Sequence, residues 1–191
     1  MSAYIHETAV VDMGAAIGEG AKIWHFCHVS ARSVIGSNCV LGQNVFVADD
    51  VILGNNVKVQ NNVSLYTGVV CDDDVFLGPS MVFTNVMNPR SHVNRKNEFR
   101  QTHVKKGASV GANATVICGV SLGCYCMVGA GAVVTRNVPD YALVAGVPAR
   151  WKGWVSRAGQ KLDFADNNTA VCSQTGEKYR LCNGKVERVE D

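Results

Sequence analysis

The sequence has little charge and no long hydrophobic segment. Charged residues make up 18% of its 191 residues, and the formal net charge is +2. These values give no reason to expect nucleic acid or a membrane surface as a partner. No apolar run approaches the roughly 20 residues that span a bilayer. The first residues also lack the basic and apolar regions of a signal peptide. We therefore expect a cytoplasmic protein without a membrane segment.

An aliphatic or similarly apolar residue recurs at every sixth position. The first series is Ile5, Val11, Ile17, Ile23, Val29, Ile35, Leu41, Val47, Leu53, Val59, Leu65, Cys71, Leu77 and Phe83, and the second is Val104, Val110, Val116, Leu122, Val128 and Val134. A period of six fits neither the 3.6 residues of a helical turn nor the two-residue repeat of a simple strand. It is typical of a hexapeptide β-helix, in which each repeat forms one short strand and one corner. The sequence therefore predicts an all-β fold.

Two further positions of the hexapeptide explain how it closes a coil. Counting the aliphatic residue as position one, position five is small or apolar, as at Ala9 and Cys27, and is expected to face the interior. Position four is usually Gly, Asn or Asp, residues that tolerate the positive φ of a tight corner. Three strands and three corners make one triangular coil, so twenty hexapeptides predict six to seven coils. With coils about 4.8 Å apart, the prism is roughly 30 Å long.

The expected organisation is a β-helix over residues 1–138 and a C-terminal extension over residues 139–191. A loop at residues 85–103 interrupts the β-helix, because Phe83 and Val104 are twenty-one residues apart where six would continue the repeat. The segment from about Asp163 is predicted to form a β-hairpin that caps one end or contacts a neighbouring subunit. All eight cysteines are expected to be reduced thiols, those at inward positions serving as small core residues.

The hexapeptides and the segment Val144-Ala-Gly-Val-Pro-Ala-Arg150 resemble the left-handed β-helix acyltransferase superfamily. The resemblance implies the left-handed twist, which the sequence pattern alone does not establish. It also implies a homotrimer that uses acetyl-CoA or another acyl-CoA, with active sites between neighbouring prisms.

The inserted loop is polar and cationic, and a long loop that leaves a rigid scaffold often carries function. The stretch Phe83-Thr-Asn-Val-Met-Asn-Pro-Arg-Ser91 resembles a narrower group of bacterial N-acetyltransferases. That group acts on UDP-2-acetamido-3-amino-2,3-dideoxy-glucuronic acid, an intermediate of lipopolysaccharide and O-antigen sugars. Residues 4–7, 23–28 and 175–179 are similar to the same group. The implied activity is acetylation of the sugar 3-amine, with acetyl-CoA as co-substrate and no metal.

The resemblance implies that Asn85 contacts the acceptor amine. A thioester is already activated, so holding the amine against its carbonyl carbon can supply most of the catalysis. His25 is the alternative, as a general base. The expected substrate-binding residues are His28, Arg32, Asn44, Asn62, Tyr66, Thr84, Arg90 and Arg95. The expected CoA-binding residues are Ala112, Ala130, Arg136, Pro148, Arg150 and Lys152.

Two other functions are compatible with parts of the pattern, and a third is excluded by it. The chain could be an N- or O-acyltransferase for another nucleotide-linked amino sugar. A zinc enzyme similar to the γ-class carbonic anhydrases would need three protein ligands, which His25, His28, His92 and His103 could nominally supply. The ending that resembles CoA-binding proteins argues against zinc. An ice-binding prism would need a repeated threonine face, and threonine occurs here only sporadically.

Overall fold

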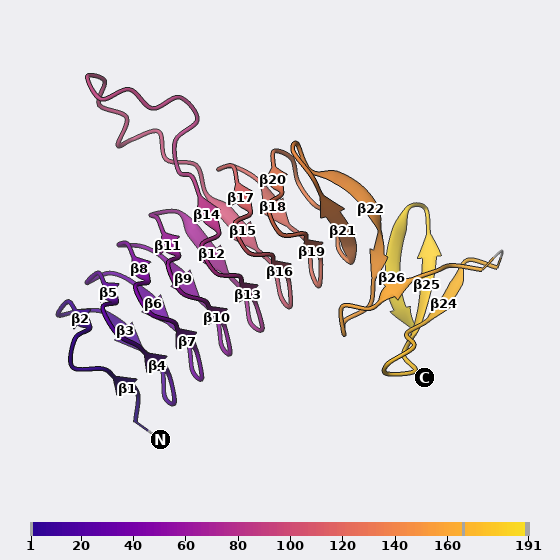
Figure 1. Cartoon of the computed structure of the whole chain (residues 1–191), viewed down its shortest axis with the longest axis horizontal. Helices are drawn as coiled ribbons and strands as arrows, with labels where there is room; N and C mark the ends of the chain where they lie inside the picture. Colours follow the sequence, from indigo (N-terminus) through magenta and orange to yellow (C-terminus); the bar gives the residue numbers. More distant parts are fainter. Residues whose placement is uncertain (1, 166, 190–191) are drawn as a thin grey trace.

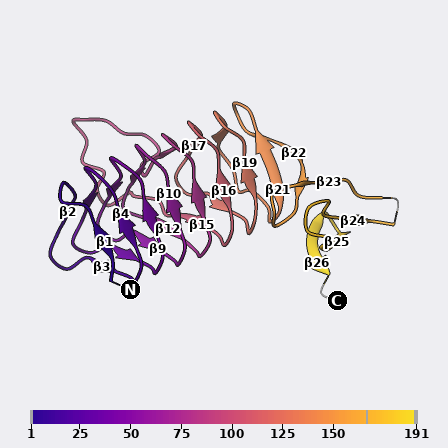
Figure 2. The same ribbon diagram turned by 60° about the horizontal axis from the view of Figure 1, so that its bottom comes forward.

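A computed structural model describes residues 2–165 and 167–189. It shows a triangular prism of stacked coils, with one loop projecting from its side and a small sheet beyond its C-terminal end (Figures 1 and 2). The fold is the predicted left-handed parallel β-helix. Residue 1 and residues 190–191, at the outer ends of the two predicted segments, lie outside the described residues. No helix in the described part of the chain is long and apolar enough to cross a membrane.

Three sheets form the faces of the prism, and from β1 to β21 consecutive strands along the chain belong to different faces. Sheet A consists of β1 (Tyr4–Ile5), β4 (Lys22–Ile23), β7 (Val40–Leu41), β10 (Lys58–Val59), β13 (Phe76–Leu77), β16 (Ser109–Val110), β19 (Met127–Val128), β21 (Ala142–Ala145), β22 (Arg150–Val155) and β23 (Lys161–Leu162). Sheet B consists of β2 (Val10–Val11), β5 (His28–Val29), β8 (Phe46–Val47), β11 (Ser64–Leu65), β14 (Val82–Phe83), β17 (Thr115–Val116) and β20 (Val133–Val134). Sheet C consists of β3 (Ala16–Ile17), β6 (Val34–Ile35), β9 (Ile52–Leu53), β12 (Val69–Cys71), β15 (Thr102–Val104) and β18 (Ser121–Leu122).

The parallel register confirms the eighteen-residue coil. Lys58 pairs with both Val40 and Phe76, one coil away on either side. Because each strand contributes one outward and one inward residue, the aliphatic position one lies inside the prism and its predecessor outside. The inward residues Val59 and Leu65 are fully buried, while the outward residue of the same strand, such as Lys58, is exposed.

The corners adopt the backbone conformation expected of position four. Asn38, Asn44 and Asn62 have φ angles of 58°, 60° and 61°. Side-chain ladders join equivalent corners of successive coils, as where the amide of Asn44 donates to Asn62 Oδ1 at 3.0 Å. Asn137 is an exception among the predicted position-four residues, since its φ is not positive. The chain leaves the coil just after it, at the isolated bridge between Leu122 and Val138.

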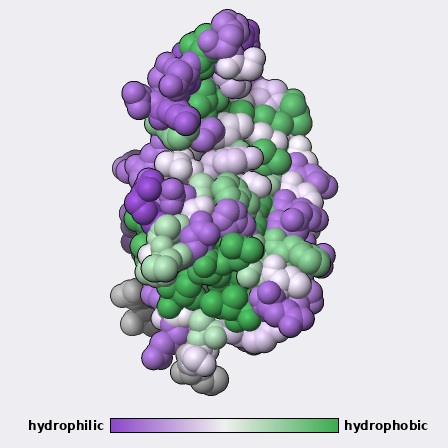
Figure 3. All heavy atoms as spheres, turned by 90° about the vertical axis from the view of Figure 1, so that its left-hand side faces the viewer, coloured by the Kyte–Doolittle hydropathy of each residue, from purple (hydrophilic) through white to green (hydrophobic). Residues whose placement is uncertain are grey.

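The two ends of the prism differ. At the C-terminal end, β21 extends sheet A in parallel and then pairs antiparallel with β22. At the N-terminal end, the first strands β1, β2 and β3 are edge strands. Ile5 is 43% exposed there, whereas Ile23, its equivalent in the next coil, is fully buried. Figure 3, which faces this end, shows hydrophobic side chains gathered on it.

A separate three-stranded antiparallel sheet follows the prism. It consists of β24 (Thr169–Val171), β25 (Lys178–Cys182) and β26 (Lys185–Val189). The last two strands form a hairpin, and β24 adds a third strand that the sequence pattern did not predict. Tyr179 is fully buried in this sheet, and its hydroxyl donates to Glu177 at 2.7 Å. The backbone N–H of Arg157 donates to the same hydroxyl at 3.0 Å, which ties the sheet to the segment after β22.

Candidate active site

The inserted loop leaves the prism where sheet B turns into sheet C, a corner that we call the BC corner. Strand β14 ends at Phe83, and Thr84 Oγ1 then accepts a hydrogen bond from the backbone N–H of Cys118 at 2.9 Å. The carbonyl of Asn85 accepts a bond from the N–H of Arg100, also at 2.9 Å, which closes the base of the loop. Residues 84 and 85 are therefore held on the rigid coil rather than in the loop itself.

The side chain of Asn85 is available for a ligand. The residue is half-buried, and within residues 2–165 and 167–189 its side-chain amide has no hydrogen-bond partner. The register of β11 on β14 places it one coil beyond Thr67, whose hydroxyl donates to the carbonyl of Asp49 at 2.9 Å. A free amide on a fixed backbone can both accept from and donate to a polar substrate group.

The loop is organised by its own contacts and extends away from the prism (Figure 1). Arg95 donates to both carboxylate oxygens of Glu98, at 2.8 and 2.9 Å. Arg90 donates to the carbonyl of Pro89 at 3.0 Å and forms no ion pair with a described carboxylate. Of the two loop arginines that the sequence predicts to bind substrate, Arg95 thus has a neutralising partner, and Arg90 has none among the described carboxylates.

The predicted substrate residues of the early coils lie on two different corners. Arg32 and Tyr66 lie on the BC corner, as Thr84 does. His25, Asn44 and Asn62 lie on the AB corner, where sheet A turns into sheet B. His28 projects from sheet B between the two corners. A single prism does not bring the two groups together, so they can share a site only across neighbouring prisms.

Arg32 is already engaged by acidic neighbours. Its guanidinium binds Asp50 through Nε at 2.9 Å and Nη2 at 3.0 Å, and it lies 3.3 Å from Asp49. The hydrogen bond from Arg32 lowers the pKa of the exposed Asp50 carboxyl. This arrangement stabilises the corner and leaves Arg32 little unpaired charge for a diphosphate.

His25 lies in an aromatic cluster near the N-terminal end. Its ring stacks on His6 with centroids 3.5 Å apart, and Trp24 lies beside it. Together with Gln43 and Gln60, Trp24 and His25 line an open cavity of about 290 Å³. His25 and Asn85 are on different corners and three coils apart in one prism, so they do not meet within one chain.

The predicted CoA residues fall into two groups. Ala112 and Ala130 occupy equivalent AB corners of successive late coils, where the N–H of Gly131 donates to the carbonyl of Ala112 at 2.8 Å. Arg136 and Arg150 both line a cavity of about 220 Å³ on the last coil. Pro148 and Lys152 are exposed and lie next to its lining residues in the chain.

Trp151 lines the same cavity, and the hexapeptide pattern does not single it out. It is 58% exposed and contacts Trp154 edge to face, with ring centroids 5.8 Å apart. The available signal was an aromatic residue directly between two cations, Arg150 and Lys152.

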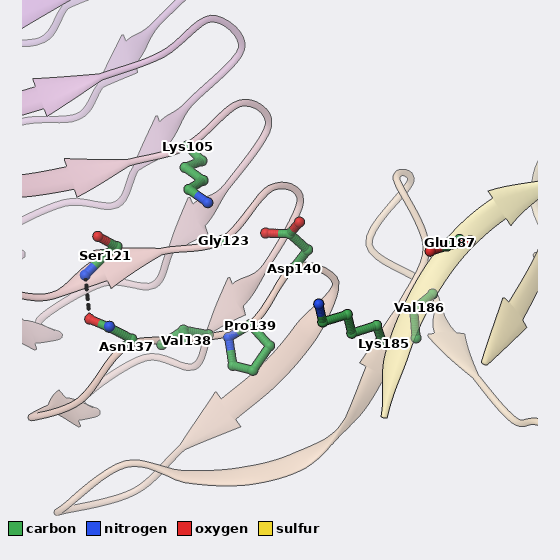
Figure 4. Close-up of a pocket in the computed structure, with 10 residues that line it drawn as sticks. All are labelled: Lys105, Ser121, Gly123, Asn137, Val138, Pro139, Asp140, Lys185, Val186 and Glu187. Atoms are coloured by element: carbon green, nitrogen blue, oxygen red, sulfur yellow. Dashed lines mark hydrogen bonds between the residues drawn. The ribbon is translucent and has the colours of Figure 1, made fainter. Parts of the chain in front are cut away.

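A cavity of about 480 Å³ lies elsewhere, where β26 meets the last coils (Figure 4). Lys105, Lys185 and Asp140 project into it, and Asp140 Oδ1 accepts from the N–H of Cys124 at 2.8 Å. No residue predicted to bind substrate or CoA lines it. This cavity lies at the junction between the C-terminal sheet and the prism.

The core cysteines are not suited to nucleophilic catalysis. Cys39, Cys71 and Cys126 are buried. Burial raises the pKa of each thiol, that of Cys126 to about 12. A thiol of that kind stays protonated near neutral pH and does not attack a thioester readily. Cys39, Cys71 and Cys126 are therefore poor candidates for an acyl-cysteine intermediate.

The histidines considered for zinc do not converge within one prism. His25 is on the AB corner, and His92 is exposed in the loop. His103 projects from sheet C, where its Nε2 lies 2.7 Å from Asp72 Oδ1. Across the residues that the structure describes, no group of three or more His, Cys, Asp or Glu side chains is placed to hold a metal ion.

Comparisons with known proteins place this geometry in a family. Residues 14–49 match the family model for the bacterial transferase hexapeptide, and residues 33–67 and 106–136 match the hexapeptide repeat of succinyl-transferase. The dTDP-3-amino-3,6-dideoxy-alpha-D-galactopyranose 3-N-acetyltransferase of Aneurinibacillus thermoaerophilus is 45% identical over 186 residues, which cover 97% of this chain and 95% of the relative. The serine acetyltransferase of Haemophilus influenzae is 43% identical over 51 residues, about a fifth of its own length.

Solved structures agree on the fold. A galactoside acetyltransferase in complex with coenzyme A superposes with a TM-score of 0.54 at 23% identity, covering 67% of this chain and 70% of that protein. The UDP-N-acetylglucosamine acyltransferase of Campylobacter jejuni superposes with a TM-score of 0.50 at 18% identity, covering 78% and 74%. The family models and the relative that spans almost the whole chain lead to one conclusion. The chain belongs to the hexapeptide-repeat acyltransferases and is an acyl-CoA-dependent sugar N-acetyltransferase.

Proposed function

We propose that this protein transfers an acetyl group from acetyl-CoA to the 3-amine of UDP-2-acetamido-3-amino-2,3-dideoxy-D-glucuronic acid, a step in making lipopolysaccharide or O-antigen sugars. The observation that carries the proposal is the side-chain amide of Asn85, which has no hydrogen-bond partner among the described residues and is fixed on the coil at the base of a cationic loop. The relative from Aneurinibacillus, which matches almost the full chain, acetylates the 3-amine of a nucleotide-linked sugar. That similarity supports the 3-amine as the reacting group.

The reaction needs few protein groups. The lone pair of the 3-amine attacks the thioester carbonyl carbon, the new C–N bond forms, and the C–S bond breaks. The departing CoA sulfur takes the proton that the amine loses, so no dedicated base is required. The Asn85 amide orients the amine through a hydrogen bond, and positioning of this kind is worth many orders of magnitude in effective concentration.

We place the site between neighbouring prisms of a homotrimer. The loop extends from the BC corner without lying on its own prism (Figure 1). Met87, Val93 and Phe99, three apolar side chains of the loop, are between 38% and 51% exposed. A second prism beside the loop would cover these side chains. It would also bring its own AB corner, with His25 and Asn44, toward Asn85.

Acetyl-CoA would lie along the late coils of two subunits. Ala112, which is half-buried, and Ala130, which is exposed, would present small side chains to the pantetheine chain. Arg136 and Arg150, which share one cavity, would hold the phosphates, with Lys152 close by in the chain. Arginine suits phosphate recognition because its guanidinium can donate two parallel hydrogen bonds.

The loop cations favour an acidic sugar. Arg90, Lys96 and Arg100 form no ion pair with the carboxylates that the structure describes. One of them could therefore bind the C6 carboxylate of a uronic acid. A second candidate substrate is dTDP-3-amino-3,6-dideoxygalactose, which has no carboxylate and is favoured by the similarity to the Aneurinibacillus enzyme.

A substrate comparison distinguishes the two candidates. We expect acetyl-CoA-dependent thiol release to be fastest with the UDP-linked 3-amino uronic acid and at least tenfold slower, in kcat/KM, with its C6-hydroxymethyl analogue. A tenfold preference corresponds to about 1.4 kcal/mol, within the range of one charge-assisted hydrogen bond. Faster turnover of dTDP-3-amino-3,6-dideoxygalactose would instead establish the second candidate.

A further inference from the structure

Three aromatic side chains form a continuous column on the outer surface of the early coils. His28 and Phe46 are the outward residues of β5 and β8, which are neighbours in sheet B (Figure 1). Their ring centroids are 5.6 Å apart. Tyr66, at the BC corner just after β11, continues the column with its ring centroid 6.3 Å from that of Phe46, in an edge-to-face arrangement.

The column is not part of the prism core. The inward residues of the same strands, Val29, Val47 and Leu65, fill the interior and are fully buried. The aromatic side chains face outward: His28 is exposed, Phe46 is half-buried and Tyr66 is 38% exposed.

An acidic side chain fixes one end of the column. Asp12 Oδ2 lies 3.1 Å from His28 Nε2, which holds the imidazole against Phe46. Within sheet B, the outward residue that follows Phe46 is the small Ser64, and then Val82. Phe46 therefore has the His28 ring on its N-terminal side. On its C-terminal side it has the hydroxymethyl group of Ser64 in the sheet and the Tyr66 ring at the adjoining corner. This surface offers an aromatic platform next to a residue that takes little space.

Phe46 and the proposed reaction centre at Asn85 lie along the same face of the prism, sheet B. Val82 begins β14, and that strand ends directly before Thr84 and Asn85. The strand of Phe46 is two coils away from this point, about 10 Å at the spacing of parallel strands. A nucleotide sugar laid along sheet B would thus have one end near Phe46 and the other near Asn85.

We propose that Phe46, supported by His28 and Tyr66, is the stacking platform for the pyrimidine base of the nucleotide sugar, and that it sets the affinity for the nucleotide. This inference rests on the proposed function, in which the acceptor is a pyrimidine-nucleotide sugar. Every pyrimidine has a flat π-face, and base stacking on aromatic side chains is a common way for proteins to hold it. Phe46 acts on binding and not on the acetyl transfer itself.

The test is a calorimetric titration of the full-length protein with UDP and with dTDP. Replacing Phe46 by alanine should weaken binding of the nucleotide about 10- to 100-fold, the effect expected for loss of one stacked base. Phe46→Tyr should retain binding within a few-fold, because the ring is kept. The matched control is Phe76→Ala: Phe76 is also a half-buried outward aromatic residue, on β13 of sheet A. The Phe76→Ala variant should bind UDP and dTDP as tightly as the wild type does.

Steady-state kinetics provide the second readout. Phe46→Ala should raise the KM for the nucleotide sugar and leave the KM for acetyl-CoA unchanged. Unaltered UDP and dTDP affinity in Phe46→Ala would overturn the platform, even if the wild type acetylates the sugar. An equal loss of nucleotide affinity in Phe76→Ala would also overturn it. So would a molar mass of Phe46→Ala in light scattering below that of the wild type, because this face would then be a contact between copies of the chain. A wild type that binds neither nucleotide would overturn both the platform and the proposed function.

Discussion

Replacing Asn85 by alanine is expected to lower kcat about 100-fold, similar to the loss of one positioned hydrogen-bonding group in other active sites. The substitution removes the amide that we propose to orient the acceptor amine. The fold should survive, because the described structure gives that side chain no hydrogen bond to lose and the loop base is closed by its backbone carbonyl. Initial rates with saturating acetyl-CoA and a 3-amino nucleotide sugar measure the effect.

Two further variants test whether the loss of kcat is specific to Asn85. Asn88→Ala removes an exposed asparagine from the same loop and should leave kcat within a few-fold of wild type. His25→Ala should lower kcat less than Asn85→Ala does, since the proposed mechanism needs no dedicated base. A general base typically contributes a factor of about 10² to 10⁴. A larger loss in His25→Ala than in Asn85→Ala would therefore contradict the mechanism and favour catalysis by histidine.

Replacing Gly36 by alanine is expected to destabilise the prism by about 1–3 kcal/mol, the usual cost of overpacking a closely packed site. A Cβ atom at this position would lie 2.3 Å from the carbonyl oxygen of Gly54 in the next coil. The contact is with backbone, so a side-chain rotation cannot relieve it and the coils must separate. Where alanine fits, replacing glycine stabilises the fold by about 0.4–1 kcal/mol, because it reduces the conformational entropy of the unfolded chain. At Gly36 the clash outweighs this gain, so we expect a net loss of stability.

The neighbouring residue supplies the control for this prediction. Ser37→Ala changes a half-buried side chain at the same corner and keeps the backbone N–H that donates to Asn55 Oδ1 at 2.9 Å. Its urea midpoint should lie close to that of the wild type, while that of Gly36→Ala should fall clearly. An unchanged midpoint in Gly36→Ala would show that the coils can spread at this corner without cost.

The sequence predicts the scaffold well because every hexapeptide carries the same local information. An aliphatic residue followed three positions later by Gly, Asn or Asp defines one inward side chain and one left-handed corner. Asn44 and Asn62 adopt that conformation, with φ near 60°. The interruption after Phe83 is equally visible as a failure of the repeat. Strand β24 escaped prediction because Thr169–Val171 is too short to show an alternating pattern.

The candidate site is harder to predict from the sequence than the scaffold, because it depends on which corner of the prism each residue occupies. His25 and Asn85 are both plausible catalytic residues by type, but the coil places them on different corners of one prism. Arg32 is a reasonable phosphate ligand by charge, and its pairing with Asp50 becomes visible only when coils are stacked. Trp151 was overlooked because it follows the last hexapeptide, where the repeat no longer assigns a direction to side chains.

The most direct test of the central claim compares two acceptors that differ at a single atom position. The protein is incubated with acetyl-CoA and either the UDP-linked 3-amino uronic acid or the matched sugar with a hydroxyl at C3. Thiol release and product mass are followed together. Our account predicts one thiol released and one acetyl group gained for each amine consumed, and no reaction of the hydroxyl sugar beyond background hydrolysis. Equal turnover of the hydroxyl sugar, or no thiol release with the amine, would contradict it.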